Sequence, residues 1–263
     1  MKKFIFFVFS SFIFLILPVS ASTLQNTFRE LNIEYGLIIQ LNPNKDSSAT
    51  TKFAAKVVGS EIRFENFTHE IKSDGKIYTL SSSIEIPKAI SLVSSLDKII
   101  RQSSGIVTKG GLQGLIISEK RGSKMDLNAT SYLPSKKKVT FLKNNQFVKE
   151  LQIEGNVTDM NSLPYLWVDS KFIPNAISIN LLDAKKIYKT DFISKKGTFV
   201  VNNQRVPIIQ FTKVKKDKED SELTITVREI DGYPVRIDFG LSAKEGVKMS
   251  IFPIQTPKQG FKF

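Results

Sequence analysis

The sequence predicts a mainly β protein: a strongly curved antiparallel sheet, half-barrel-like, packed on one long amphipathic helix. Two observations indicate the sheet. Apolar and polar residues alternate in many short segments, as at Leu223, Ile225 and Val227, and turn residues such as Asp231-Gly232 separate these segments. Such alternation is typical of an antiparallel sheet with one face in the core. The helix is indicated by one long stretch with helical periodicity.

That stretch runs from Pro87 to Gln102. Its apolar residues recur at spacings of three and four, which places them on one face of a helix: Ala89, Leu92, Val93, Leu96, Ile99 and Ile100. Pro87 suits the first helical position because it has no N–H to satisfy there. Gly105 follows the last periodic residue and suits the end of a helix. We therefore expect this helix to pack on the concave face of the sheet.

The rest of the chain reads mainly as strands joined by short turns. The predicted strands span 32–41, 52–58, 61–70, 76–86, 106–109, 112–119, 125–133, 137–142, 147–153, 176–182, 186–193, 197–201, 205–213, 223–229, 233–241 and 247–254. A second, shorter helix is predicted over 158–167, where Asp159 suits the N-cap and Pro164 limits the length.

The first 21 residues have the pattern of a cleaved secretory signal. Lys2-Lys3 precedes an apolar run, and Val19-Ser20-Ala21 fits a signal-peptidase site. The apolar run is shorter than the roughly 20 residues of a spanning helix. We expect export to the periplasm of a Gram-negative bacterium, a single β-rich domain over 22–256 and a loose tail over 257–263.

The composition excludes several kinds of chemistry. The chain has no cysteine and one histidine, His69, so it has no disulfide, thiol nucleophile or site with two imidazoles. His69 shares a strand face with Phe67 and Ile71, which favours a structural or surface histidine over a general base or a metal ligand. The formal net charge of +13 suits an anionic partner, but export argues against nucleic acid. We expect no cofactor and no metal.

Three groups of residues resemble a known family. These are Ser103-Ser104-Gly105 with Gly110-Gly111-Leu112, then Asp159 to Leu163, and Asp231 to Ile237 leading to Gly246. On these patterns the chain resembles the exported Gram-negative bacterial proteins known as domain of unknown function 3108, over about 32–254. The resemblance implies a periplasmic, sheet-rich protein, similar to the open half-barrels of lipoprotein and lipid carriers. It implies no reaction and no functional residue.

The predicted function is non-enzymatic binding of an apolar or amphiphilic envelope ligand, such as a lipid, between helix and sheet. Apolar clefts of this kind are the usual sites for small molecules. The candidate ligand-facing residues are Leu92, Val93, Leu96, Ile100 and Trp167.

Two alternatives stay open. An envelope scaffold would bind an anionic surface through the lysine-rich exterior. A periplasmic hydrolase would need a carboxylate pair beside the scissile bond, and Asp217/Asp220 and Glu229/Asp231 are the candidate pairs. These pairs lie in predicted turns among lysines, so solvated acids are the simpler interpretation. No catalytic residue is predicted.

Overall fold

In the computed structural model of the protein, one continuous sheet of fifteen strands forms most of the described structure. The structure describes residues 29–85, 98–109, 111–122, 127–168, 173–201, 204–216, 220–242 and 246–255. The predicted signal and C-terminal tail lie outside these ranges. The described strands are β1 (Arg29–Leu41), β2 (Glu61–Ser73), β3 (Ile77–Glu85), β4 (Lys98–Thr108), β5 (Gly111–Arg121), β6 (Asn128–Leu133), β7 (Lys138–Lys143), β8 (Gln146–Gln152), β9 (Asn156–Asp159), β10 (Ala176–Leu182), β11 (Ile187–Val201), β12 (Gln204–Lys213), β13 (Leu223–Arg228), β14 (Pro234–Ser242) and β15 (Val247–Pro253).

The strand order is that of two meanders joined at their outer strands. It runs from β8 back to β1, then from β15 back to β9, so the first and last strands pair antiparallel in the middle. Only β9 and β10 pair in parallel within the described ranges. The end strands β8 and β9 are not bonded to each other there, so the sheet is not closed into a barrel.

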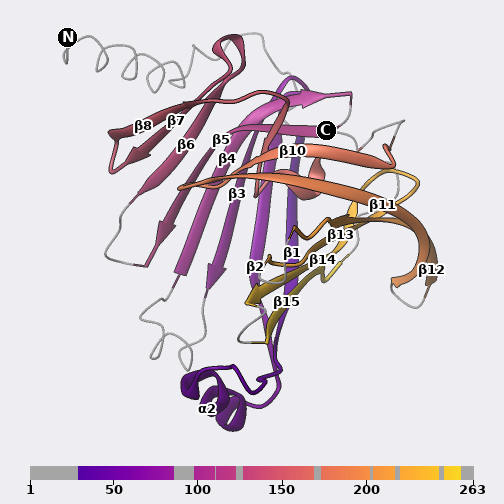
Figure 1. Cartoon of the computed structure of the whole chain (residues 1–263). Coiled ribbons are helices and arrows are strands. Elements are labelled where there is room, and N and C mark those ends of the chain that lie inside the picture. Colours follow the sequence, from indigo (N-terminus) through magenta and orange to yellow (C-terminus); the bar gives the residue numbers. More distant parts are fainter. Residues whose placement is uncertain are drawn as a thin grey trace.

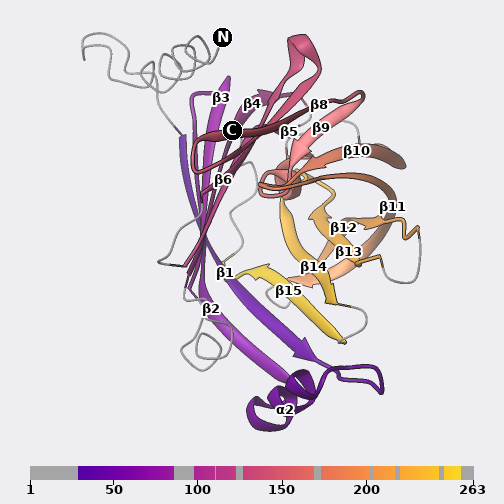
Figure 2. The same ribbon diagram turned by 60° about the vertical axis from the view of Figure 1, so that its left-hand side comes forward.

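The two halves of the sheet bend toward each other around a short irregular segment. Figure 2 shows β1–β6 nearly edge-on at the left, with β10–β14 on the opposite side at the right. β9 and the short 3-10 helix η2 (Leu163–Tyr165) lie against the inner face of β5, and η2 also contacts β14. The main core includes Tyr35, Leu80, Tyr165 and Phe211, from both halves and the segment between them.

The predicted long helix packed on the sheet is wrong. Its last five residues, Lys98–Gln102, begin β4 and pair with both β3 and β5, while 86–97 lie outside the described residues. Ile99 and Ile100 are neighbours in a strand and therefore face opposite sides of the sheet. Pairing with a strand on each side outweighs the helical spacing of the side chains here. The segment with β9 and η2 covers the inner face instead.

Other predicted elements also change type. The predicted strand 52–58 belongs to the helix α2 (Ala49–Val58), which Ser48 caps by accepting a hydrogen bond from the N–H of Thr51. In Figure 1 this helix lies at the far end of β1 and β2. The predicted helix 158–167 is the end of β9 followed by η2. A further 3-10 turn, η1, spans Pro134–Lys136. No helix in the described ranges is long and apolar enough to cross a membrane.

Gly114 marks the place where β9 crosses β5. A Cβ at this position would overlap Oδ2 of Asp159. We expect Gly114→Ala to lower the free energy of unfolding by about 1–3 kcal/mol, the usual cost of an overpacked core. Urea denaturation would measure this. Gly197→Ala is the matched control in β11, because its Cβ would lie 3.4 Å from Ile208 Cδ1, an ordinary contact. Equal losses in both variants would contradict the steric argument.

Candidate functional site

The turn between β9 and η2 is built around a buried carboxylate. Oδ1 of Asp159 accepts hydrogen bonds from the N–H groups of Asn161 and Ser162, at 2.8 and 2.9 Å, and from the hydroxyl of Ser103, at 2.8 Å. Oδ2 accepts from the hydroxyl of Ser162 at 2.8 Å. Burial raises the pKa of Asp159, and these hydrogen bonds oppose that rise. The carboxylate thus fixes the turn and ties it to β4.

Further side chains fix η2 against the sheet. The hydroxyl of Tyr78, on β3, donates to Oγ of Ser162 at 2.5 Å, and Ser82 Oγ donates to Oδ1 of Asn161 at 2.9 Å. Gly111 and Gly232 both have positive φ angles and pack directly on carbonyl oxygens at the end of η2 and just after it. A Cβ at either glycine would overlap those oxygens. The segment therefore has little freedom to move.

An aromatic network lies beneath η2. The hydroxyl of Tyr165 is 2.6 Å from Nδ1 of His69 and 2.5 Å from the hydroxyl of Tyr35. Nε2 of His69 has no hydrogen-bond partner within the described ranges. Burial, and then the positive charge of Arg101, lower the pKa of His69 to about 3. His69 is therefore a neutral, buried residue at neutral pH.

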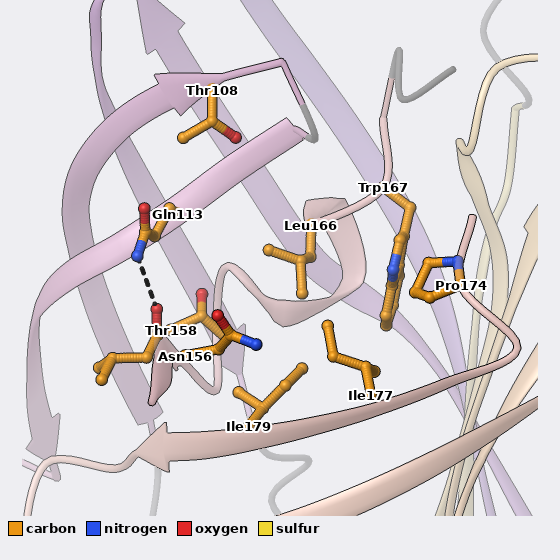
Figure 3. A pocket seen from close by; sticks show the side chains of 10 residues that line it. Thr108, Gln113, Asn156, Thr158, Leu166, Trp167, Pro174, Ile177 and Ile179 are labelled. Carbon is orange, nitrogen blue, oxygen red and sulfur yellow. Dashed lines mark hydrogen bonds between the residues drawn. The ribbon is translucent and has the colours of Figure 1, made fainter. Parts of the chain in front are cut away.

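A cavity of about 250 Å³ opens beside Trp167, between the end of η2 and β10. Figure 3 shows Trp167 and Pro174 on one side, with Ile177 and Ile179 below. The lining residues are Thr108, Gln113, Asn156, Val157, Thr158, Leu166, Trp167, Pro174, Ile177 and Ile179. The apolar and polar side chains lie mainly on different sides, so the cavity is amphiphilic.

Trp167 is a rigid wall of this cavity. Its ring stacks on Phe211 of β12, with ring centroids 3.6 Å apart and an angle of 6° between the planes. On the polar side, Gln113 donates from Nε2 to the carbonyl of Val157 at 3.1 Å (Figure 3). The cavity is thus preformed on well-held elements, a property of small-molecule sites.

The structure brings only one of the predicted ligand-facing residues to this cavity. Trp167 lines it, whereas Leu92, Val93 and Leu96 lie outside the described residues. Ile100 neighbours Arg101 in β4 and so faces away from the side on which Ser103 reaches Asp159.

Sequence reasoning missed Gln113, Leu166 and Ile177 as residues of the cavity wall. The alternation in 176–182 was a signal that Ile177 and Ile179 share a face. Whether a cavity lies over that face depends on the path of the chain after β9, and the alternation of residue types does not predict this path.

The acid pairs proposed for a hydrolase are engaged elsewhere. Arg228 donates to both carboxylate oxygens of Asp231, and Lys196 pairs with Glu229 at 2.5 Å. Asp220 pairs with Lys213, and Asp217 lies outside the described residues. Across the described ranges, no three His, Cys, Asp or Glu side chains are grouped so that they could hold a metal ion.

Comparisons with known proteins give no function. No family model matches the chain, and a search of curated proteins found no match. Among solved structures, the chain is similar to the beta-barrel-like protein of domain of unknown function DUF1849 from Brucella abortus. The TM-score is 0.45 at 9% sequence identity, over 85% of this chain and 96% of that chain. That neighbour represents another domain of unknown function, so the resemblance to family 3108 stays a prediction.

Proposed function

We propose that this protein is an exported, non-enzymatic binding protein that holds the apolar end of an amphiphilic envelope molecule in the cavity beside Trp167. One observation carries the proposal. A preformed cavity with an aromatic and aliphatic wall and a separate polar side lies between the two halves of the sheet. Small-molecule sites have this combination of apolar walls and a few placed polar groups. The predicted signal sequence supports an envelope ligand.

The size of the cavity limits the ligand. A volume of about 250 Å³ lies between the roughly 150 Å³ that accommodates benzene and the roughly 300–1,000 Å³ of sites for larger ligands. We therefore expect the cavity to take one ring or a short stretch of acyl chain, with the rest of the ligand outside. Trp167 would contact the apolar part, and Asn156 and Thr108, which also line the cavity, offer polar side chains to the rest of the ligand.

Native mass spectrometry of the protein purified from the bacterial periplasm tests the proposal. The expected result is a reproducible additional mass, identified as an amphiphile after solvent extraction. A ligand-free mass in preparations from several growth conditions would count against it.

A fluorescence titration tests the cavity itself, because Trp167 is the only tryptophan of the chain. Hexanoate, octanoate, decanoate and dodecanoate should each change its emission, with affinity that rises with chain length until the cavity is filled. Ile177→Phe narrows the cavity and should weaken binding by about tenfold, equivalent to about 1.4 kcal/mol.

The matched control is Ile193→Phe, at an exposed position of β11 that does not line the cavity. Its affinity should equal that of the unchanged protein. If both variants bind alike, the ligand does not occupy the cavity.

A further inference from the structure

A second site lies at the other end of β4 and β5, away from the cavity. Arg101 on β4 pairs with Glu119 on β5, and Ile99 pairs with Arg121. These residues alternate with the outward-facing positions and share the inner face with Ser103, which reaches Asp159. Two arginines and one glutamate therefore occupy adjacent places on the inner face of the sheet.

Glu119 holds both guanidinium groups side by side. Its side chain is only 2% exposed, and its two oxygens accept from Nε of Arg101 at 2.7 Å and from Nε of Arg121 at 2.6 Å. Nη2 of Arg121 also donates to Glu119 at 3.2 Å. Burial raises the pKa of Glu119, but the hydrogen bond from Arg121 and the charge of Arg101 outweigh it, so the pKa lies below its usual value. The glutamate is an ionised anchor.

The two arginines keep unused donors at a solvent-accessible position. Their side chains are 27% and 48% exposed. Both terminal nitrogens of Arg101 and Nη1 of Arg121 donate to no described residue. The two free terminal nitrogens of Arg101 can bind a carboxylate or phosphate group in a bidentate manner, and Nη1 of Arg121 offers a further donor. The donors are therefore arranged for an oxyanion.

Two acids act on the arginines, one in contact and one at longer range. Glu119 is the only described carboxylate within ion-pair distance of either arginine, so the contact group has two positive charges and one negative. Asp183, near the β10–β11 turn, interacts with Arg121 at longer range. Beyond Glu119, the charge of Arg101 still acts on His69. Together with Asp183 these charges sum to zero, so the free N–H groups of the two arginines, not an excess of positive charge, would hold an arriving anion.

We propose that Arg101 and Arg121, held by Glu119, form a binding site for a phosphate or carboxylate group. The apolar side chains of Ile84 and Ile99, which pair across β3 and β4 beside Arg121, provide a surface for the adjoining part of the ligand. This site is independent of the cavity beside Trp167. The anionic group comes either from a soluble molecule or from a lipid headgroup, and the two sources share the same chemistry.

Thermal unfolding with added inorganic phosphate tests the site. A ligand that binds only the folded protein raises the unfolding temperature. We expect phosphate to raise it more than sodium chloride at equal ionic strength. Arg121→Gln should weaken phosphate binding at least about tenfold. Arg121→Lys keeps the charge but loses the free Nη1 and the two-nitrogen contact with Glu119 that positions it, so it should also weaken binding. This variant keeps the test decisive if Arg121→Gln does not fold.

Arg63→Gln is the matched control. Arg63 also donates from Nε to a glutamate, Glu61, at 2.7 Å, but on an exposed strand and without a second arginine. This variant should bind phosphate like the unchanged protein. Stabilisation by phosphate no greater than by chloride, or equal in the Arg121 variants, would overturn the proposal.

Vesicles distinguish the two sources of the anion. The unchanged protein should bind vesicles of phosphatidylcholine with phosphatidylglycerol, in competition with inorganic phosphate, if the site takes a lipid headgroup. Binding of inorganic phosphate without binding of these vesicles assigns a soluble ligand. Vesicle binding that Arg121→Gln and inorganic phosphate leave unchanged would contradict a role of this site in it.

Discussion

Replacing Asp159 with alanine should lower the free energy of unfolding by about 2–6 kcal/mol. The change leaves two buried N–H groups, of Asn161 and Ser162, without their acceptor, at about 1–3 kcal/mol each. The hydroxyls of Ser103 and Ser162 lose the same acceptor, but hydroxyls can rotate toward other partners. Urea denaturation followed by circular dichroism would measure the loss.

Asp159→Asn separates the hydrogen bonds from the charge. The amide oxygen can accept the hydrogen bonds made to Oδ1, and the amide N–H₂ can face Ser162. We expect a loss of less than about half that of Asp159→Ala. Similar losses in the two variants would show that the negative charge, not the hydrogen bonding, holds the turn.

The stability of the protein should fall in mild acid because of His69. Its pKa is lowered to about 3 in the folded protein, first by burial and then by the charge of Arg101, from 6.5 in the unfolded chain. Below about pH 6.5 the unfolded chain gains a proton that the folded protein does not bind. The free energy of unfolding should drop by about 1 kcal/mol from about pH 7 to about 5.5, and by up to about 1.4 kcal/mol per further pH unit.

The assignment to His69 is testable because it is the only histidine in the chain. Carboxylates have usual pKa values near 4, and Asp159, whose pKa is raised by burial, would favour the folded state as the pH falls, so among these groups only the imidazole lowers stability between about pH 5.5 and 7. His69→Gln keeps a polar partner for the hydroxyl of Tyr165 and should have nearly constant stability over that range. An unchanged pH dependence in this variant would show that another group titrates.

Strand positions were largely predictable, because alternation and turn residues are local signals. The segment 176–182 is β10 as predicted, and Leu223, Ile225 and Val227 face the core. The error at Pro87–Gln102 came from adjacent isoleucines, which fit one face of a helix but also fit two faces of a strand. The choice between helix and strand depends on β3 and β5, which pair with this segment on both sides, and the sequence of the segment alone does not predict these partners.

The candidate sites were less predictable than the fold, because each joins distant parts of the chain. Trp167 was predicted to face a ligand, but its partner Phe211 and the cavity wall at Gln113 come from strands far away in the sequence. The arginine pair required the register of β4 against β5. Asp159 was predicted as the N-cap of a helix, and this was wrong: it fixes the turn before η2, and its partner Ser103 is 56 residues away in sequence.

The pairing of β1 with β15 has a consequence for the order of folding. Tyr35 lies opposite Pro253, 253 − 35 = 218 residues later in the chain. β1 can pair with β2 early, but it can pair with β15 only after the chain as far as Pro253 is available. Contacts between such distant residues form slowly, since a long loop must close first. Until then, each meander is a separate sheet with an unpaired boundary strand, a situation that favours misassembly. Among the described strands, the last one in the sequence, β15, is thus the one that joins the two meanders.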